Sequence, residues 1–215
     1  MARRKRPGPV VKALAAVLLL GIGGAVLWAG PRTGRSEPAG GQVVFLGDSI
    51  TEFCDLAVYY PGLDAVNEGI AGDTTEGMLG RLERVIAAQP AIVVVHGGIN
   101  DLLSGYEGEH IVENLWAIVR TIHERLPGAG VVVQSLYPIG EGEDLYFTER
   151  IRAVNERLAG AAKELDYRYA DVFPALQTED GRLDGRYSDD GLHPNAAGYQ
   201  AACPVVRQAL EKAGR

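Results

Sequence analysis

The chain of 215 residues contains only two cysteines, Cys54 and Cys203, with no C-x-x-C pair and no spacing typical of metal ligands. We expect no zinc site and interpret the cysteines as separate buried thiols, with a Cys54–Cys203 disulfide as the alternative. The sequence also lacks a phosphate-binding Walker loop and a dinucleotide-binding glycine motif, because the glycines near 21–24 lie in an apolar segment. Neither class of nucleotide site is indicated.

Positive charge is scarce beyond residue 40. Residues 1–40 carry seven Lys/Arg and one acidic residue, a net charge of +6, whereas the remaining chain has 14 basic and 27 acidic residues, a net charge of −13. An acidic domain argues against nucleic acid and against an anionic membrane surface as partners. The composition instead suits an enzyme that acts on neutral esters or sugars.

The first 40 residues have the layout of an export signal. A basic stretch precedes a 17-residue apolar run without a charge at 13–29, and a loose polar stretch follows. The run is at the short end of what spans a bilayer, and it lacks a clean small-x-small cleavage site. We expect residues 1–40 to be an uncleaved membrane anchor and linker with the basic end in the cytoplasm, and residues 41–215 to be an exported domain. A cleaved signal and a secreted domain are the alternative.

Beyond residue 41, apolar runs alternate with helical patterns. The runs at 92–95 and 131–133 are continuously apolar and β-branched, as strands buried on both faces should be. This alternation predicts an α/β fold with a mostly parallel sheet and helices on both faces. The expected strands are 42–46, 64–67, 91–96, 130–135 and 167–171. The expected helices are 74–89 with Asp73 as its N-cap, 109–126, 148–165 and 196–213.

Four polar segments follow the expected strands or lead into the expected helices. Because the carboxyl ends of parallel strands share one edge of a sheet, we expect these segments to meet there. They are Gly47-Asp48-Ser49, the loop 67–74 with Gly72, the loop 97–101 with Asn100, and the segment 190–194 with Asp190 and His193.

These residue types predict ester hydrolysis by a serine nucleophile. His193 would take the proton of Ser49, and Asp190, three residues before the histidine, would hold the imidazole in the required tautomer. Asp189 competes for this role but lacks the spacing. Three donors would bind the oxyanion of the tetrahedral intermediate: the Ser49 N–H, the Gly72 N–H and the Asn100 side-chain amide.

Together, the four segments resemble the SGNH, or GDSL-type, hydrolase family over about residues 42–210. The resemblance implies that Ser49 is the nucleophile, that His193 and Asp190 are the base and its orienting acid, and that Gly72 and Asn100 are oxyanion donors. It also implies a flavodoxin-like, three-layer α/β/α sandwich with about five parallel strands. No metal or organic cofactor is expected from it.

Neighbouring residues are expected to be structural. Asp48 and Asp101 should hold loops through hydrogen bonds, and His96 should be a satisfied residue of the core or of the layer behind the site. The family pattern is altered at Ile50, where the family's nickname has leucine, and at Ile99, where many relatives carry a small polar residue. Neither change removes an expected site residue.

The resemblance to short members of the family favours a small acyl group. We expect an esterase that removes O-acetyl groups from a saccharide or a cell-surface glycan, with the ester as its partner and the N-terminal segment in contact with a membrane. A lysophospholipase-like or thioesterase-like lipid esterase is the close alternative, and an acyltransferase using a sugar hydroxyl in place of water is another. A non-catalytic glycan-binding module is disfavoured, because a binder needs neither a nucleophile nor a base. The sequence carries no signal for an oligomeric state.

Overall fold

The computed structural model describes residues 41–140 and 145–214. Within them, five strands form one sheet in the order β2-β1-β3-β4-β5, and each neighbouring pair is parallel. Each strand overlaps one that the apolar runs predicted. The strands are β1 (Val43–Gly47), β2 (Ala65–Gly69), β3 (Ile92–His96), β4 (Gly130–Gln134) and β5 (Arg168–Ala170).

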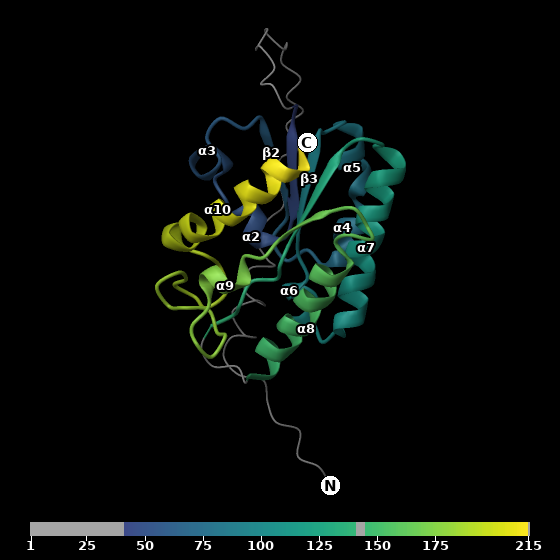
Figure 1. The fold of residues 1–215 in the computed structure, drawn as a ribbon. Coiled ribbons are helices and arrows are strands. Elements are labelled where there is room, and N and C mark those ends of the chain that lie inside the picture. Colours follow the sequence, from purple (N-terminus) through teal and green to yellow (C-terminus); the bar gives the residue numbers. More distant parts are fainter. Residues whose placement is uncertain (1–40, 141–144, 215) are drawn as a thin grey trace, which may run out of the picture. The chain divides into compact units, whose positions relative to one another are not determined.

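Helices cover both faces of this sheet, which confirms the predicted three-layer α/β/α sandwich. One side carries α4 (Thr75–Gly80), α5 (Leu82–Ala87) and α7 (Gly108–Arg125), and the other carries α3 (Leu56–Tyr59) and α10 (Ala196–Ala213) (Figure 1). The remaining helices are α2 (Ser49–Glu52), α6 (Ile99–Leu103), α8 (Leu145–Ala161) and α9 (Phe173–Leu176). Helices α3, α6 and α9 were not predicted, because one helical turn is too short to show a periodic pattern.

The register of the sheet brings three strand ends level with one another. Gly47, the last residue of β1, pairs with Gly69 of β2 and with His96 of β3. The chain leaves β1 for β2 on one side and then passes to β3 on the other, so this edge is the topological switch point of the sheet. The loops that follow β1, β2 and β3 therefore begin side by side, as the four polar segments require.

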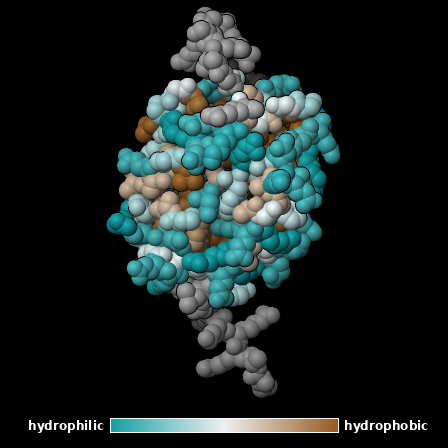
Figure 2. Space-filling view, in the orientation of Figure 1, coloured by the Kyte–Doolittle hydropathy of each residue, from teal (hydrophilic) through white to brown (hydrophobic). Residues whose placement is uncertain are grey.

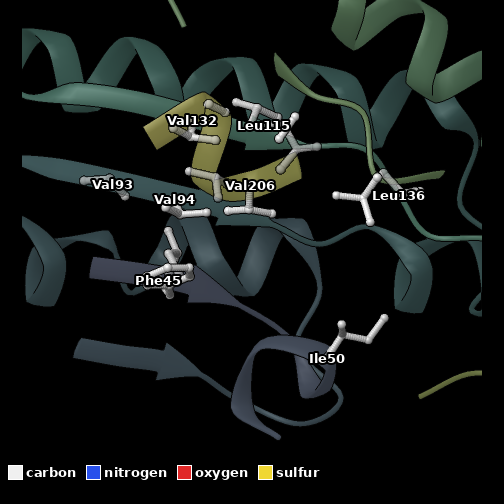
Figure 3. Packing of buried hydrophobic residues seen from close by; sticks show 14 of the residues in the cluster. Phe45, Ile50, Val93, Val94, Leu115, Val132, Leu136 and Val206 are labelled. Atoms are coloured by element: carbon white, nitrogen blue, oxygen red, sulfur yellow. The ribbon is translucent and has the colours of Figure 1, made fainter. Parts of the chain in front are cut away.

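The core lies between the sheet and the two helix layers. Strands β1 and β3 are buried along their whole length, as expected for strands covered on both faces. Figure 3 shows Leu115 of α7 and Val206 of α10 together with Val94 and Val132 of the strands, and all four side chains are buried. The apolar side chains that α7 and its C-cap residue turn towards the sheet are buried as well: Ile111, Leu115, Ile118, Ile122 and Leu126.

The prediction of a single helix over 74–89 with Asp73 as its N-cap is wrong in two respects. The helix is divided into α4 and α5 at Arg81, whose backbone is not helical (φ −109°, ψ 13°). Its N-cap is Thr74, whose hydroxyl accepts the Gly77 N–H, and not Asp73. Asp73 is instead bound by Arg81, since Arg81 Nε donates to Asp73 Oδ2 at 2.6 Å. This ion pair therefore joins Asp73, the predicted cap, to Arg81, the residue at which the helix is divided.

The structure contradicts the predicted exported, membrane-anchored location. No helix in the described ranges 41–140 and 145–214 is long and apolar enough to cross a membrane. The apolar run at 13–29, on which the anchor, its cleavage and the contact with a membrane were predicted, lies outside those ranges.

Both cysteines are buried and free, which agrees with the favoured interpretation of two thiols. Burial, with a smaller effect of the nearby Cys203, raises the pKa of Cys54 to about 12. Cys54 therefore stays protonated at neutral pH and is not a reactive thiolate.

The face of the domain in Figure 2 is mostly hydrophilic, with hydrophobic residues in small patches. Few large hydrophobic side chains are exposed, and two of them follow elements that end at the carboxyl edge of the sheet: Phe53 comes after α2 and Ile70 after β2. The others among the described residues are Val58, Tyr106 and Tyr146.

Candidate active site

Ser49 is the first residue of α2, directly after the turn that ends β1. Asp48 caps this short helix, because its Oδ1 accepts the Ile50 N–H at 3.0 Å. The turn requires glycine at position 47, since a Cβ there would come within 2.5 Å of the His96 carbonyl oxygen. Ser49 is 6% exposed. Its hydroxyl is thus held at the switch point of the sheet.

The structure brings together the predicted nucleophile, Ser49, and the two residues predicted to activate it, His193 and Asp190. Ser49 Oγ lies 2.9 Å from His193 Nε2, although the two residues are 144 positions apart. The other ring nitrogen, Nδ1, lies 2.6 Å from Asp190 Oδ2. Asp189, the competing carboxylate, instead accepts a long hydrogen bond of 3.4 Å from Asn195 Nδ2. The spacing argument that favoured Asp190 over Asp189 agrees with this geometry.

The surroundings of Asp190 keep it ionised. Burial acts to raise its pKa, but the hydrogen bonds from the His193 ring and from the N–H groups of His193 and Leu192 outweigh burial and lower the pKa to about 2. A carboxylate can only accept, so we assign the proton of the imidazole to Nδ1. Nε2 is then free to accept the hydroxyl proton of Ser49, as a general base must.

The remaining two predicted donors lie beside each other. Asn100, the second residue of α6, is buried, and its Nδ2 donates to the Asp73 carbonyl at 2.9 Å. Gly72 directly precedes Asp73 and has a φ of +80°, which favours glycine. The amide group of Asn100 has two hydrogens, and no hydrogen bond within the described residues uses the second one. Among the hydrogen bonds within the described residues, none uses the N–H of Ser49 or of Gly72.

Arg81 joins the loops around the serine, and no sequence signal had singled it out. Its Nη2 donates to the Gly47 carbonyl and its Nη1 to the Glu68 carbonyl, each at 2.9 Å. Its Nε binds the carboxylate of Asp73, next to Gly72. The side chain is only 14% exposed. Arg81 therefore fixes the ends of β1 and β2 relative to the loop that carries one expected oxyanion donor.

Two further side chains that sequence reasoning missed fasten α2 to the loop after β2. Asn67 Nδ2 donates to the carbonyls of Thr51 (2.8 Å) and Cys54 (3.1 Å). Glu52 Oε2 accepts the Ala71 N–H at 2.5 Å. A helix of four residues has little stability of its own. These hydrogen bonds therefore stabilise α2 and fix its position against the loop after β2.

Asp101 and Asp48 are both fully buried, but only Asp101 is fully satisfied. Asp101 accepts the Thr75 N–H at 3.0 Å and the Thr75 hydroxyl at 2.6 Å, which confirms its predicted role in holding a loop. Asp48 Oδ2 has no hydrogen-bond partner in the described part of the chain. Burial raises the pKa of Asp48 to about 7, the Ile50 N–H opposes this shift, and the carboxylates of Asp73 and Asp101 add to it.

His96, at the end of β3, is a neutral core residue, as predicted. It is 3% exposed and packs against Tyr137, with ring centroids 4.4 Å apart and an interplanar angle of 38°. Burial lowers its pKa to about 4, against the opposing effect of a hydrogen bond with the Ser135 backbone. Over residues 41–140 and 145–214, no cluster of three or more His, Cys, Asp or Glu side chains is placed to hold a metal ion.

Comparison with known proteins identifies the family. Residues 45–201 match the GDSL-like lipase/acylhydrolase family. The chain belongs to this family. Platelet-activating factor acetylhydrolase IB subunit alpha1 from Bos taurus is 34% identical to this GDSL-like acylhydrolase over 176 residues, which make up 79% of this chain and 75% of the relative. The alpha2 subunit from Mus musculus is 27% identical over the same length, 76% of its own chain.

Solved structures share the fold. A GDSL-like lipase from Bacteroides thetaiotaomicron matches with a TM-score of 0.70 and 27% identity, over 80% of this chain and 88% of its own. A catalytic mutant of an acetylxylan esterase from Geobacillus stearothermophilus matches with a TM-score of 0.67 and 21% identity, over 80% of this chain and 94% of its own. The second likeness shows the fold alone. Family membership makes the chain a GDSL-type acylhydrolase, a hydrolase that acts on esters.

Proposed function

We propose that this acylhydrolase is a serine esterase that removes a short acyl group, acetyl in the first place, from a saccharide through an acyl-serine intermediate. The observation that carries the proposal is the hydrogen-bonded series Ser49–His193–Asp190 at the switch point of the sheet. In this series, Asp190 orients a neutral imidazole whose free nitrogen faces the serine hydroxyl.

In the first half-reaction, His193 Nε2 takes the proton of Ser49 as Oγ attacks the ester carbonyl carbon. The carbonyl oxygen becomes an oxyanion, and the proposed donors around it are the Ser49 N–H, the Gly72 N–H and the free hydrogen of the Asn100 amide. His193 then gives its proton to the alcohol oxygen, the ester C–O bond breaks, and the acyl group stays on Ser49. Asp190 stabilises the imidazolium that forms in between.

In the second half-reaction, water replaces the alcohol. His193 takes a proton from the water as its oxygen attacks the acyl carbon, and a second oxyanion forms in the same place. Collapse of this intermediate releases the carboxylic acid, and the proton on His193 returns to Ser49. No step of this cycle needs a metal or an organic cofactor, so we propose an enzyme without either.

Acetyl is favoured because the name of one similar protein specifies it: a relative at 34% identity is a platelet-activating factor acetylhydrolase subunit. The net charge of −13 beyond residue 40 supports a neutral alcohol such as a saccharide over an anionic lipid or nucleic acid. The acetylhydrolase relative specifically favours a second candidate, an esterase of acetylated lipids.

The test is a substrate panel with the full chain and its Ser49→Ala variant. We expect acetyl esters to be hydrolysed faster than dodecanoyl esters, and Ser49→Ala to lower kcat by about 10⁴ or more while the circular dichroism spectrum stays unchanged. Ser104→Ala, which alters an exposed serine, is the matched control. Near-normal activity of Ser49→Ala would remove Ser49 from the mechanism, and faster turnover of the dodecanoyl ester would overturn the short-acyl proposal.

The panel also separates the remaining alternatives. Acetylated xylo-oligosaccharides and an acetylated lysolipid distinguish the two candidate alcohols by kcat/KM. Product analysis with and without an acceptor sugar distinguishes hydrolysis from acyl transfer, because a transferase yields an acylated sugar where a hydrolase yields free acid.

A further inference from the structure

Phe53 places an exposed aromatic ring beside the proposed general base. Its ring centroid lies 5.2 Å from that of His193, with an interplanar angle of 58°. Phe53 nevertheless remains 55% exposed. Of the large hydrophobic side chains exposed in the described part of the chain, Phe53 is the one that packs against His193.

The position of the ring follows from the local backbone. Phe53 ends α2, and its N–H donates to the Ser49 carbonyl at 2.9 Å, so the two residues are one helical turn apart. Residues at this separation lie on the same face of a helix, and a helical side chain leans towards the preceding turn. The phenyl ring is therefore directed to the side of α2 that carries the nucleophile.

The backbone on either side of Phe53 is held in place. Asn67 Nδ2 binds the carbonyls of Thr51 and Cys54, and Glu52 binds the Ala71 N–H. The ring thus stands on a fixed support instead of a free loop. An apolar surface fixed beside a polar site and left open to water is typical of a ligand contact, because binding a ligand would remove that surface from water.

The direction of proton transfer tells which half of the ester would meet this ring. His193 gives its proton to the alcohol oxygen, so the alcohol must lie against His193 when the C–O bond breaks. The acyl oxygen lies on the side of Gly72 and Asn100, the proposed oxyanion donors. Phe53 packs on the imidazole, and its open surface is therefore next to the alcohol half.

We propose, on the basis of the function proposed above, that Phe53 is the contact residue for the alcohol half of the ester and stacks on the C–H face of a sugar ring. The C–H groups of a sugar face are weakly positive, and the face of an aromatic ring is negative. The ring is 55% exposed, and a flat partner suits such an open surface better than a long alkyl chain, which favours an enclosed apolar site.

The experiment compares three acetyl esters with the full chain and its Phe53→Ala, Phe53→Tyr and Val58→Ala variants. The esters are an acetylated xylo-oligosaccharide, an acetylated lysolipid and ethyl acetate, whose alcohol is too small to cover a ring. We expect Phe53→Ala to lower kcat/KM for the sugar ester about tenfold more than for ethyl acetate, mainly through KM. Phe53→Tyr should keep kcat/KM for the sugar ester near the wild-type value, because tyrosine keeps the aromatic ring. Val58→Ala removes an exposed side chain elsewhere and should keep the wild-type ratio.

Three outcomes would overturn the inference. An equal loss for all three esters would mean that Phe53 supports His193 and does not contact the alcohol. A larger loss for the lysolipid than for the sugar ester would assign the ring to an alkyl chain. Wild-type kcat/KM for all three esters in Phe53→Ala would mean that the ring makes no contact with the ester. In each case Ser49→Ala still reports separately on the proposed function, because it removes the nucleophile whatever the alcohol.

Discussion

Asp48 and Asp190 both neighbour the Ser49–His193 pair, yet their surroundings are opposite. Asp48 is fully buried, its Oδ2 has no hydrogen-bond partner among the described residues, and burial raises its pKa to about 7. The side chain of Asp190 is 55% exposed. Burial also acts to raise the pKa of Asp190, but hydrogen bonds from His193 and Leu192 outweigh it and lower the pKa to about 2. The balance between lost hydration and supplied donors thus decides which carboxyl group is charged.

The comparison separates two tasks of carboxyl groups at one site. A negative charge at Asp190 favours the Nδ1–H tautomer of His193 and stabilises the imidazolium. The same charge at Asp48 would lie next to the Ser49 N–H, where the proposed mechanism develops an oxyanion. A carboxyl group that keeps its proton up to about neutral pH caps α2 without opposing that oxyanion.

The largest effect, on kcat, is expected at Asp190, the carboxyl group that the proposed mechanism needs in its charged form. Asp190→Asn should lower kcat for an acetyl ester by about 10⁴, because the neutral amide can donate to Nδ1 and so favours the wrong tautomer. The half-exposed position should leave the fold intact. Steady-state kinetics and a thermal melt measure the two effects separately.

Asp189→Asn is the matched control for this variant. Asp189 lies one residue away and contacts Asn195 at 3.4 Å instead of His193. Its substitution should change kcat/KM by no more than a factor of about 3. Equal losses in the two variants, or a loss below tenfold in Asp190→Asn, would contradict the required charge at Asp190.

An intermediate effect, on stability, is expected at Asp48. Asp48→Ala leaves the buried Ile50 N–H without an acceptor, whereas Asp48→Asn keeps one and also keeps a good N-cap residue. The alanine variant should therefore be less stable than the asparagine variant by roughly 1–3 kcal/mol, measured by urea unfolding at one pH. If the two variants were equally stable, the cap would contribute nothing. If the asparagine variant kept its stability but lost activity, and the alanine variant lost activity too, the carboxyl group would be needed as a charge.

The sequence was sufficient to predict the sheet and the polar residues at its edge. Continuous apolar runs mark β1 and β3, and the residues after them can only lie at the carboxyl edge of a parallel sheet. It was not sufficient for the framework around Ser49. Arg81 lies on what reads as an exposed helix position, yet its guanidinium binds two strand ends and Asp73.

The same limit explains the helix that was predicted as one and is two. Its cap and its break depend on Asp73 and Arg81, whose contact is made only after the fold has brought the ends of β1 and β2 together. Local propensity does not contain such a contact. The open ring of Phe53 against His193 is of the same kind, since it joins residues from opposite ends of the domain.

The smallest effect expected is on the pH dependence of stability, and it distinguishes the two aspartates directly. In the unfolded chain Asp48 ionises near its ordinary pKa of 3.8, whereas in the fold it keeps its proton up to about pH 7. Between these values the unfolded state binds fewer protons, so wild-type stability should fall as the pH rises, and Asp48→Asn should lack this loss.

The pKa of Asp190 is lowered from 3.8 to about 2, so its contribution to stability is fully present above pH 3.8 and is lost only as the pH falls towards 2. Between pH 5 and 8, the urea midpoint of Asp48→Asn should therefore rise relative to that of the wild type, whereas the Asp190 carboxyl group is ionised in both states and adds no pH dependence of its own. A constant difference between Asp48→Asn and the wild type would mean that Asp48 is ionised throughout this range.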